Sequence, residues 1–156
     1  MSTMAYIPED AKWYLADIVE VITVEGDPRN VVHTNLTLIR ADSPEDAYRK
    51  AIELGTSADR SYRNPAGKLV TFRFAGLGDL NVVHEDFEHG AELIFSEDVD
   101  VDAATIDSWV SSKEDLAVFR EAAPNPGPDY RAADLVEELY ERMRHPKSGG
   151  GPETIH

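Results

Sequence analysis

The sequence contains no cysteine among its 156 residues. Disulfide bonds, zinc sites built on thiolates and cysteine nucleophiles are therefore excluded. The lack of cysteine suits a reducing compartment, and the opening MSTMAYIPEDAKWYLA has neither the basic start nor the apolar core of a signal peptide. We therefore expect a cytoplasmic protein, and no pattern in the sequence indicates a cofactor.

Positive charge and long apolar runs are also scarce. Lys and Arg number 15 against 30 Asp and Glu, which gives a net charge of -15 and a pI near 4.6. Such a chain repels phosphate backbones and anionic membrane surfaces, and its apolar runs are too short to span a bilayer. We expect neither nucleic acid nor a membrane as partner. The acidity favours a basic protein partner, or it simply keeps the protein in solution.

The composition is otherwise that of one globular domain with a tail, because 42% of the residues are hydrophobic and 29% are charged. The run PNPGP cannot continue a helix or strand and predicts a linker. We divide the chain into an N-terminal extension (residues 1–12), an α+β domain (13–122), a Pro/Gly linker (123–128), an amphipathic helix (129–145) and a flexible tail (146–156).

Two strands joined by a turn are expected at the start of the domain. Residues 13–25 are rich in β-branched and aromatic side chains and are apolar on both faces, which is typical of a strand covered on both sides. GDPRN then supplies turn residues, and residues 31–41 follow as a second strand. In this second strand Val32, Leu36 and Leu38 share one face, and the opposite face is polar.

A helix over residues 43–54 is expected next. Ser43 can cap it, Pro44 suits its first position, and Gly55 is predicted to end it. Further along the chain we predict a polar connection with a turn, then three strands, then two short helical segments, in this order: residues 56–68 with the turn at 64–67, strands at 69–75, 80–86 and 91–97, and helical segments within 102–119.

These elements predict an α+β fold: an antiparallel sheet of four or five strands with one main helix packed on a face, plus C-terminal helical segments. We expect the segments within residues 102–119 to pack against an edge or end of the sheet. One helix cannot cover five strands, so the C-terminal segments or a second copy of the chain must complete the cover. A homodimer, formed by the sheet or by the C-terminal helix, is the further expectation.

Polar side chains on two expected strands form the first candidate site. His33, Asn35 and Thr37 share the polar face of the second strand, and Thr71 and Arg73 could neighbour them from another strand. Such a group could bind a small anion through its arginine, or use a histidine as a base in hydrolysis. The alternative is that this face is merely the solvent side of an antiparallel sheet.

Asp17 is a second residue of interest, because it interrupts the apolar first strand. A buried, unpaired carboxylate would keep its proton or require a cation. An edge position or a pairing with an arginine on the neighbouring strand would satisfy it without any function.

The run HEDFEHG concentrates potential metal ligands, with His84 and His89 at its ends. The two histidines are five positions apart, so the run does not match HExxH, and on a strand they would point to opposite faces. A metal site would require a turn that brings them together. The alternative, which the spacing favours, is a solvated hairpin whose acidic residues protect a sheet edge.

The predicted C-terminal helix has a continuous apolar stripe. Its members are Leu135, Val136, Leu139, Tyr140 and Met143. A helix of this length is only marginally stable in water, so the stripe needs a surface to cover it. That surface is its own sheet, a second copy, or the groove of another protein. We predict these five residues to be partner-binding.

Three phrases of the sequence resemble a known family: WYLADIVEVI, VVHTNLTLIRADSPEDAYRKAIELG and SYRNPAGKLVTFRFAGLGDLNVVHEDFEHGAELIF. They are similar to a bacterial family of domains of unknown function, whose members open on a Trp-Tyr or Trp-Phe pair and continue with a strand and a DSPEEAYEKALELG-like helix. The resemblance covers residues 13–95. It implies no known activity and no catalytic residues.

The sequence has no GxGxxG, GxxxxGK[ST] or GxSxG motif. An acidic α+β protein without a recognisable catalytic group is most economically a non-catalytic protein-binding module, of the inhibitor or immunity type. The alternative is a small-ligand-binding or hydrolytic protein that uses the polar sheet face.

Overall fold

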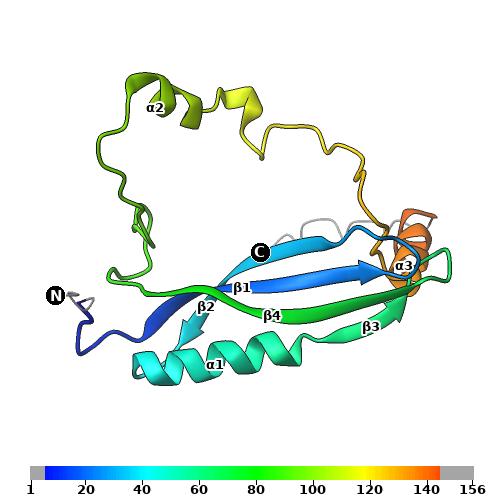
Figure 1. The fold of residues 1–156 in the computed structure, drawn as a ribbon, viewed down its shortest axis with the longest axis horizontal. Coiled ribbons are helices and arrows are strands. Elements are labelled where there is room, and N and C mark those ends of the chain that lie inside the picture. Colours follow the sequence, from blue (N-terminus) through cyan, green and yellow to red (C-terminus); the bar gives the residue numbers. More distant parts are fainter. Residues whose placement is uncertain (1–5, 145–156) are drawn as a thin grey trace, which may run out of the picture.

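The protein is described here by a computed structural model that covers residues 6–144. Its centre is a four-stranded antiparallel sheet with the strand order β2-β1-β4-β3 (Figure 1). The strands are β1 (Trp13–Val24), β2 (Val31–Arg40), β3 (Arg60–Arg63) and β4 (Leu69–Val82). The predicted α+β fold, with four strands and one main helix on the sheet, is confirmed.

The face of the sheet that α1 (Pro44–Ser57) covers, here called the inner face, carries the core. On β1 the inner side chains are Tyr14, Ala16, Ile18, Ile22 and Val24, all of them buried. The opposite, outer face of β1 is mostly half-buried, although Leu15 is buried there. The strict alternation expected of a strand therefore places the stronger apolar face against the helix.

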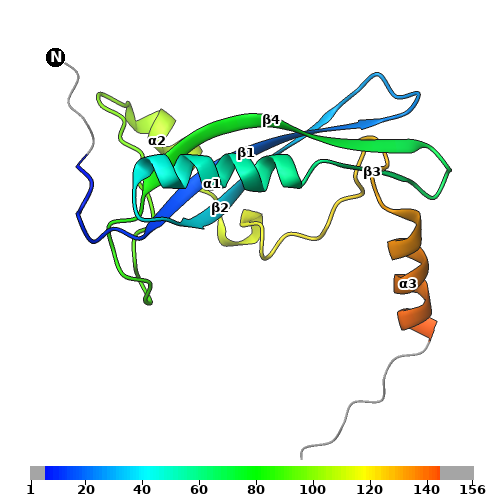
Figure 2. The ribbon, with the colours of Figure 1, turned by 90° about the horizontal axis from the view of Figure 1, so that it is seen from below.

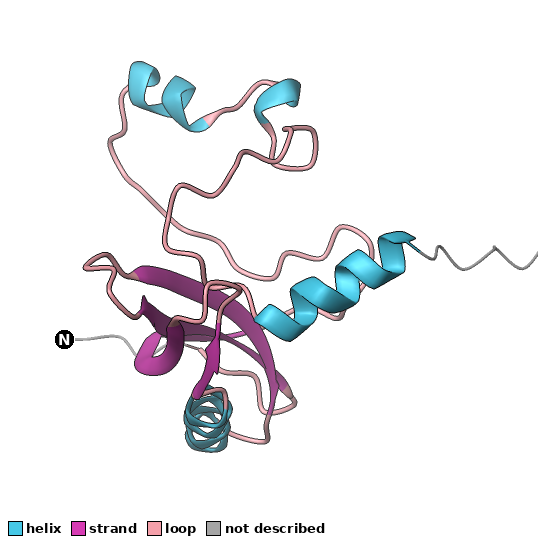
Figure 3. Cartoon of the chain, turned by 90° about the vertical axis from the view of Figure 1, so that its right-hand side faces the viewer, coloured by secondary structure: helices cyan, strands magenta, loops and turns pink. Residues whose placement is uncertain are grey.

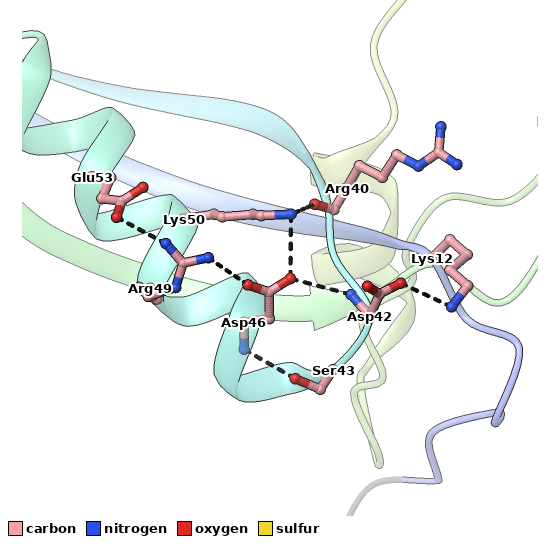
Figure 4. Close-up of polar contacts among 8 residues, drawn as sticks. All are labelled: Lys12, Arg40, Asp42, Ser43, Asp46, Arg49, Lys50 and Glu53. Carbon is pink, nitrogen blue, oxygen red and sulfur yellow. Dashed lines mark hydrogen bonds and ion pairs between the residues drawn. The ribbon is translucent and has the colours of Figure 1, made fainter.

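Helix α1 begins where the sequence predicts. The Ser43 hydroxyl accepts a hydrogen bond from the Asp46 N–H at 3.1 Å and so caps the helix. The Asp46 carboxylate in turn contacts Arg49 at 2.7 Å and Lys50 at 3.2 Å (Figure 4). These contacts hold an acidic side chain at the positive end of the helix dipole, which is its favourable position.

The end of α1 differs from the prediction. Gly55 was expected to terminate the helix, but α1 continues to Ser57 and is closed by Ala58. Gly55 is buried and faces the ring of Phe74 on β4. Because Gly55 has no side chain, the helix can pack closely on the sheet at this point. The glycine therefore serves helix packing and does not end the helix.

The other half of the inner face is covered by residues 125–131, here called the strap. A second core cluster of Ile22, Val24, Val70 and Phe72 lies beyond the end of α1, and Tyr130 of the strap packs against it. Pro128 of the strap is buried. Two parts of the chain that are far apart in sequence therefore share the task of covering one sheet face.

Three strand predictions require correction. Strand β3 lies inside residues 56–68, which were expected to be a connection, although the turn at residues 64–67 is confirmed by a hydrogen bond from the Gly67 N–H to the Asn64 carbonyl. The two strands expected around Gly76 and Gly78 form the single strand β4, whose pairing with β1 shifts register twice. Residues 91–97 form no strand.

A long arch, residues 96–124, connects the two ends of the sheet (Figures 1 and 3). It contains α2 (Ala103–Trp109), capped by Asp102 as predicted, and the short 3-10 helix η1 (Lys113–Asp115). The expectation that this region packs against the sheet is wrong, because the arch runs apart from it and neither helix buries a residue. Apolar side chains such as Trp109 and Phe119 remain exposed.

The last element, α3 (Ala133–Arg144), starts four residues later than predicted, because the preceding residues form the strap. It projects from the end of the sheet at which the two hairpin turns lie (Figure 2). His145 and the predicted tail lie outside the described residues, as do residues 1–5. Within residues 6–144 no helix is long and apolar enough to cross a membrane.

Candidate functional site

A buried carboxylate lies on the inner face between α1 and the strap. Glu20 follows the same alternation as Ile18 and Ile22 and is only 7% exposed. Asn35 on the neighbouring strand β2 donates a hydrogen bond from Nδ2 to Glu20 Oε2 at 2.8 Å. A buried acid requires such a donor, because desolvation of an ionised carboxylate is costly. The pair therefore forms a polar floor within an otherwise apolar sheet face.

Above this floor lies a cavity of about 480 Å³ between the sheet and residues 130–135. Its lining comes from all four strands, from the end of the strap and from the start of α3: Glu20, His33, Asn35, Arg60, Tyr62, Phe72, Tyr130, Arg131, Ala132 and Leu135. The cavity is thus formed jointly by the sheet and by a segment some sixty residues further along the chain.

Aromatic rings form one wall of the cavity. The rings of Tyr130 and His33 are nearly perpendicular, with 5.4 Å between their centroids. The Tyr130 ring is also nearly perpendicular to that of Phe72, with 6.4 Å between centroids. The Phe72 ring is also 5.8 Å from that of Tyr62. The Arg60 guanidinium carbon lies 3.8 Å from the centroid of the Phe72 ring, which is a cation–π arrangement. This wall offers flat apolar surfaces with a cation at one side.

The two arginines of the cavity differ in their partners. Arg131 pairs with Asp129 at 2.8 Å, and its hydrogen bonds hold the pKa of that carboxyl below its usual range. Arg60 donates to the Ala58 carbonyl at 2.9 Å, and among residues 6–144 it forms no ion pair with a carboxylate. Arg60 is therefore the cation of the cavity whose charge is not compensated by a neighbour.

The cavity contains one imidazole, that of His33. His33 is opposite Glu20 in the strand register, but in the described structure no hydrogen bond joins its imidazole to a carboxylate. A base oriented by an acid would need that contact. Burial raises the pKa of the Tyr62 hydroxyl, so Tyr62 stays a protonated donor, and its hydrogen goes to the Tyr130 carbonyl.

The sequence-predicted ligand set is divided by the sheet. His33, Asn35 and Thr37 lie on the inner face, because they are the register partners of Glu20, Ile18 and Ala16. Thr71 and Arg73 pair with Thr23 and Val21 and lie on the outer face. The prediction that the five share a face is wrong, since alternation within each strand does not reveal how two strands are aligned. Only His33 and Asn35 line the cavity.

Seven residues of the cavity are not among the site residues predicted from the sequence: Glu20, Arg60, Tyr62, Phe72, Tyr130, Arg131 and Ala132. Glu20 could have been found by applying the alternation of its strand, which places it between inward residues. Asp17, which was singled out instead, is half-buried on the outer face, with Asp79 as its register partner on β4. Tyr130 carried no local signal, because its position depends on the return of the chain over the sheet.

The apolar side of β2 is the solvent side. Val32, Leu36 and Leu38 are 51%, 58% and 46% exposed on the outer face. β2 is also an edge strand, so one row of its backbone N–H and carbonyl groups has no strand partner, and of these the Arg40 carbonyl accepts a hydrogen bond from Lys50 Nζ at 2.8 Å. We call the free edge and these three side chains the β2 surface.

The remaining predicted positions lie apart from the cavity. His84 and His89 are both exposed, and in the described part of the chain no group of three potential ligands could hold a metal ion. Their loop is organised by Phe87, whose ring lies 5.3 Å from that of Trp13, and by a hydrogen bond from the Glu92 N–H to Glu85.

The predicted partner stripe on α3 is exposed at Leu135, Leu139, Tyr140 and Met143. The side chain of Val136 lies outside the described structure. Leu135 also lines the cavity, so the first turn of α3 contributes to the site.

Comparison with known proteins identifies a family and nothing further. No curated protein and no solved structure matches the chain. One family model matches residues 13–95, which is more than half of the chain and contains the whole sheet and α1. The match ends before the arch, the strap and α3. The chain belongs to the family described as Domain of unknown function (DUF4288).

Proposed function

We propose that the protein is a non-catalytic protein-binding module whose docking surface is the β2 surface. The observation that carries the proposal is the exposure of Val32, Leu36 and Leu38 along a free edge. Natural edge strands are usually protected by lysine, proline, a bulge or inward charges. β2 is ten residues long, contains no proline, lysine or acidic residue, and pairs with β1 without a register shift.

The occupant that fits this surface is an extended strand of a partner protein, added antiparallel or parallel to β2. Alternate side chains of the partner strand would contact the three apolar residues on the outer face. Since the chain carries a net charge of -15, cationic residues beside the strand would speed association. An inhibitor or immunity-type protein that meets a basic target would use such an arrangement.

A labelled peptide of alternating Val and Thr with Lys at both ends tests this proposal. The peptide should bind the full chain, and increased salt should weaken the binding. Leu36→Lys should abolish the binding, because it places a charge in the centre of the surface. Leu139→Lys is the matched control, since Leu139 is a leucine of α3 with nearly the same exposure, 57% against 58% for Leu36. Equal binding by the two variants would refute the β2 surface, and a doubled light-scattering mass that Leu36→Lys restores to one chain would identify a second copy as the occupant instead.

A second candidate function is the binding of a small molecule in the cavity, and the buried Glu20 favours it. Glu20 can accept a hydrogen bond from an amine or hydroxyl, Arg60 can pair with an anionic group, and the rings of Phe72 and Tyr130 can hold a flat apolar part. A small zwitterion with an aromatic side chain, such as an aromatic amino acid, combines these features.

Thermal-shift measurements with the free aromatic amino acids test the second candidate. Stabilisation of the wild-type chain should be lost in Glu20→Gln. Asp17→Asn is the matched control, because Asp17 lies on the same strand but on the outer face. No stabilisation of the wild type, or the same stabilisation of both variants, would count against the cavity as a ligand site.

A further inference from the structure

Three side chains of the sheet hairpins hold the strap by its main chain. Arg29 Nη1 donates to the Pro126 carbonyl at 3.0 Å, Asn64 Nδ2 donates to the Asp129 carbonyl at 3.0 Å, and the Tyr62 hydroxyl donates to the Tyr130 carbonyl. Hydrogen bonds from side chains to the carbonyls of an extended segment are independent of that segment's sequence. They are a recurring means of binding peptides.

The three donors are held in place by contacts within the sheet hairpins. Asp27 binds the Arg29 guanidinium through both carboxylate oxygens, at 3.1 and 2.8 Å. Asn64 is 4% exposed, and its side-chain oxygen accepts a hydrogen bond from the Lys68 N–H at 2.9 Å. The Tyr62 ring packs against that of Phe72, with 5.8 Å between centroids. Each donor is therefore held by a contact that does not involve the strap, which lowers the entropic cost of binding.

Sequence-specific contact with the strap is confined to a short stretch. Pro128 is buried and the Tyr130 ring packs against the second core cluster, whereas Asn125 and Pro126 are exposed. Gly127 passes close to Val31, because a Cβ atom at Gly127 would lie 3.7 Å from Val31 Cγ2. The groove thus recognises the side chains of a proline and a tyrosine, and its three donors bind the main-chain carbonyls around them.

The strap is joined to the sheet by an arch that adds no packing of its own. Residues 96–124 contain no buried residue. The groove residues Arg29, Tyr62, Asn64 and Phe72 lie within the part of the chain that matches the family, and the strap lies beyond it. The receptor groove and its occupant are therefore separable parts of the chain.

We propose that the groove under the strap is a peptide-binding site for non-helical segments of the type Pro-x-Tyr, and that residues 125–131 are its tethered ligand. This inference does not depend on the β2 surface, and the groove shares Tyr62, Phe72 and Tyr130 with the small-molecule cavity. A tether gives an intramolecular ligand an effective concentration on the order of millimolar when its length matches the distance it spans. A free peptide at micromolar concentration therefore cannot displace the strap from the wild-type chain.

A synthetic peptide of residues 123–132, with a fluorescent label, is the probe. The receptor is the full chain in which residues 126–131 are replaced by a Gly-Ser sequence of equal length, so that the tether is kept and the ligand is removed. The peptide should bind this variant saturably, and at least about tenfold more tightly than it binds the wild type. The full chain with Tyr130→Ala is the second receptor, and it should also bind the peptide. Tyr140→Ala, at an exposed tyrosine of α3, should behave as the wild type.

The contacts of the groove can be tested in the same assay. A peptide with alanine in place of the tyrosine should not bind, and Arg29→Ala in the Gly-Ser receptor should weaken binding several-fold. The proposal is overturned if the peptide fails to bind a folded receptor, or if the tyrosine-free peptide binds equally well. It is also overturned if both receptor variants unfold, because the strap would then be an inseparable part of the core.

Discussion

Gly55 is a point of close contact between α1 and the sheet. A Cβ atom at this position would lie 2.5 Å from two ring carbons of Phe74, which is far below van der Waals contact. The Phe74 ring itself packs against the first core cluster, so it cannot move without disturbing that cluster. Glycine is thus required here by packing density, whereas its backbone freedom is not used.

Gly55→Ala is therefore expected to destabilise the protein by about 1–3 kcal/mol, the usual cost of overpacking. In an uncrowded helix the same substitution would stabilise by up to about 1 kcal/mol. Urea denaturation measures the free energy of unfolding, and Thr56→Ala at the neighbouring exposed position is the control. A gain in stability for Gly55→Ala would mean that the helix does not approach Phe74 this closely.

Asp27 is the residue whose protonation should affect folding in acid. Hydrogen bonds from the Arg29 side chain and main chain lower the pKa of Asp27 from 3.8 to about 2. Because the folded-state pKa lies below the unfolded value, the contribution of Asp27 to stability is complete above about pH 4 and is lost as the pH falls toward 2.

Unfolding measured from pH 5 to pH 2 should accordingly show a steeper loss of stability in the wild type than in Asp27→Asn. Other carboxyls, including those of Asp46 and Asp129, also have lowered pKa values. Their protonation will cause part of the loss of stability in acid in both proteins. Asp86→Asn is the control, because Asp86 is exposed and forms no ion pair in the described structure. Identical pH profiles for the wild type and Asp27→Asn would contradict this account of the Asp27–Arg29 pair.

At the scale of elements, local signals determined what the sequence could predict. The capped helix after Ser43, the first two strands and the Asp102 cap were all predictable, because each depends on neighbouring residues. The inward face of β2 was not, since alternation divides a strand into two faces without saying which one meets the core. The register with β1 places polar His33 inside and apolar Leu36 outside.

Strand formation also depends on the presence of a partner. The polar segment RSYR becomes β3 because the edge of β4 is available beside it, and Tyr62 anchors it in the second core cluster. The more apolar residues 91–97 remain unpaired, although their composition favours a strand. The cavity could not be predicted from local sequence patterns either, because Glu20 and Tyr130 come to line it only after the chain has returned across the sheet.

Ser43→Ala tests the start of α1 as an element. Loss of the hydroxyl that accepts the Asp46 N–H should cost about 1 kcal/mol of stability. Ser112→Ala is the matched control: Ser112 precedes η1, but its hydroxyl donates to the exposed Asp115 carboxylate at 2.8 Å and caps no backbone N–H of that helix. A thermal or urea unfolding curve compares the two, and equal losses would show that the Ser43 cap has no special role.

At the scale of the whole molecule, one sheet face is completed by two different means. Helix α1 covers the first core cluster and belongs to the matched family region, whereas the strap covers the second cluster and comes from beyond that region. Helix α3 follows the strap directly but leaves most of its apolar stripe exposed. The strap and α3 should therefore contribute very differently to stability, although they are adjacent in sequence.

Two truncated chains separate these contributions. A chain ending at Ala132 keeps the strap and lacks α3, and its melting temperature should stay close to that of the full chain, because little of α3 is buried. A chain ending at Pro124 also loses the burial of Pro128 and Tyr130, worth about 1.5–3 kcal/mol for a buried side chain of this size. Its melting temperature should fall by about 5–15 °C relative to the Ala132 chain. If removal of α3 alone caused most of the fall, the stripe from Leu135 to Met143 would have to pack on the protein's own surface in solution, and a role for α3 in partner binding would lose its basis.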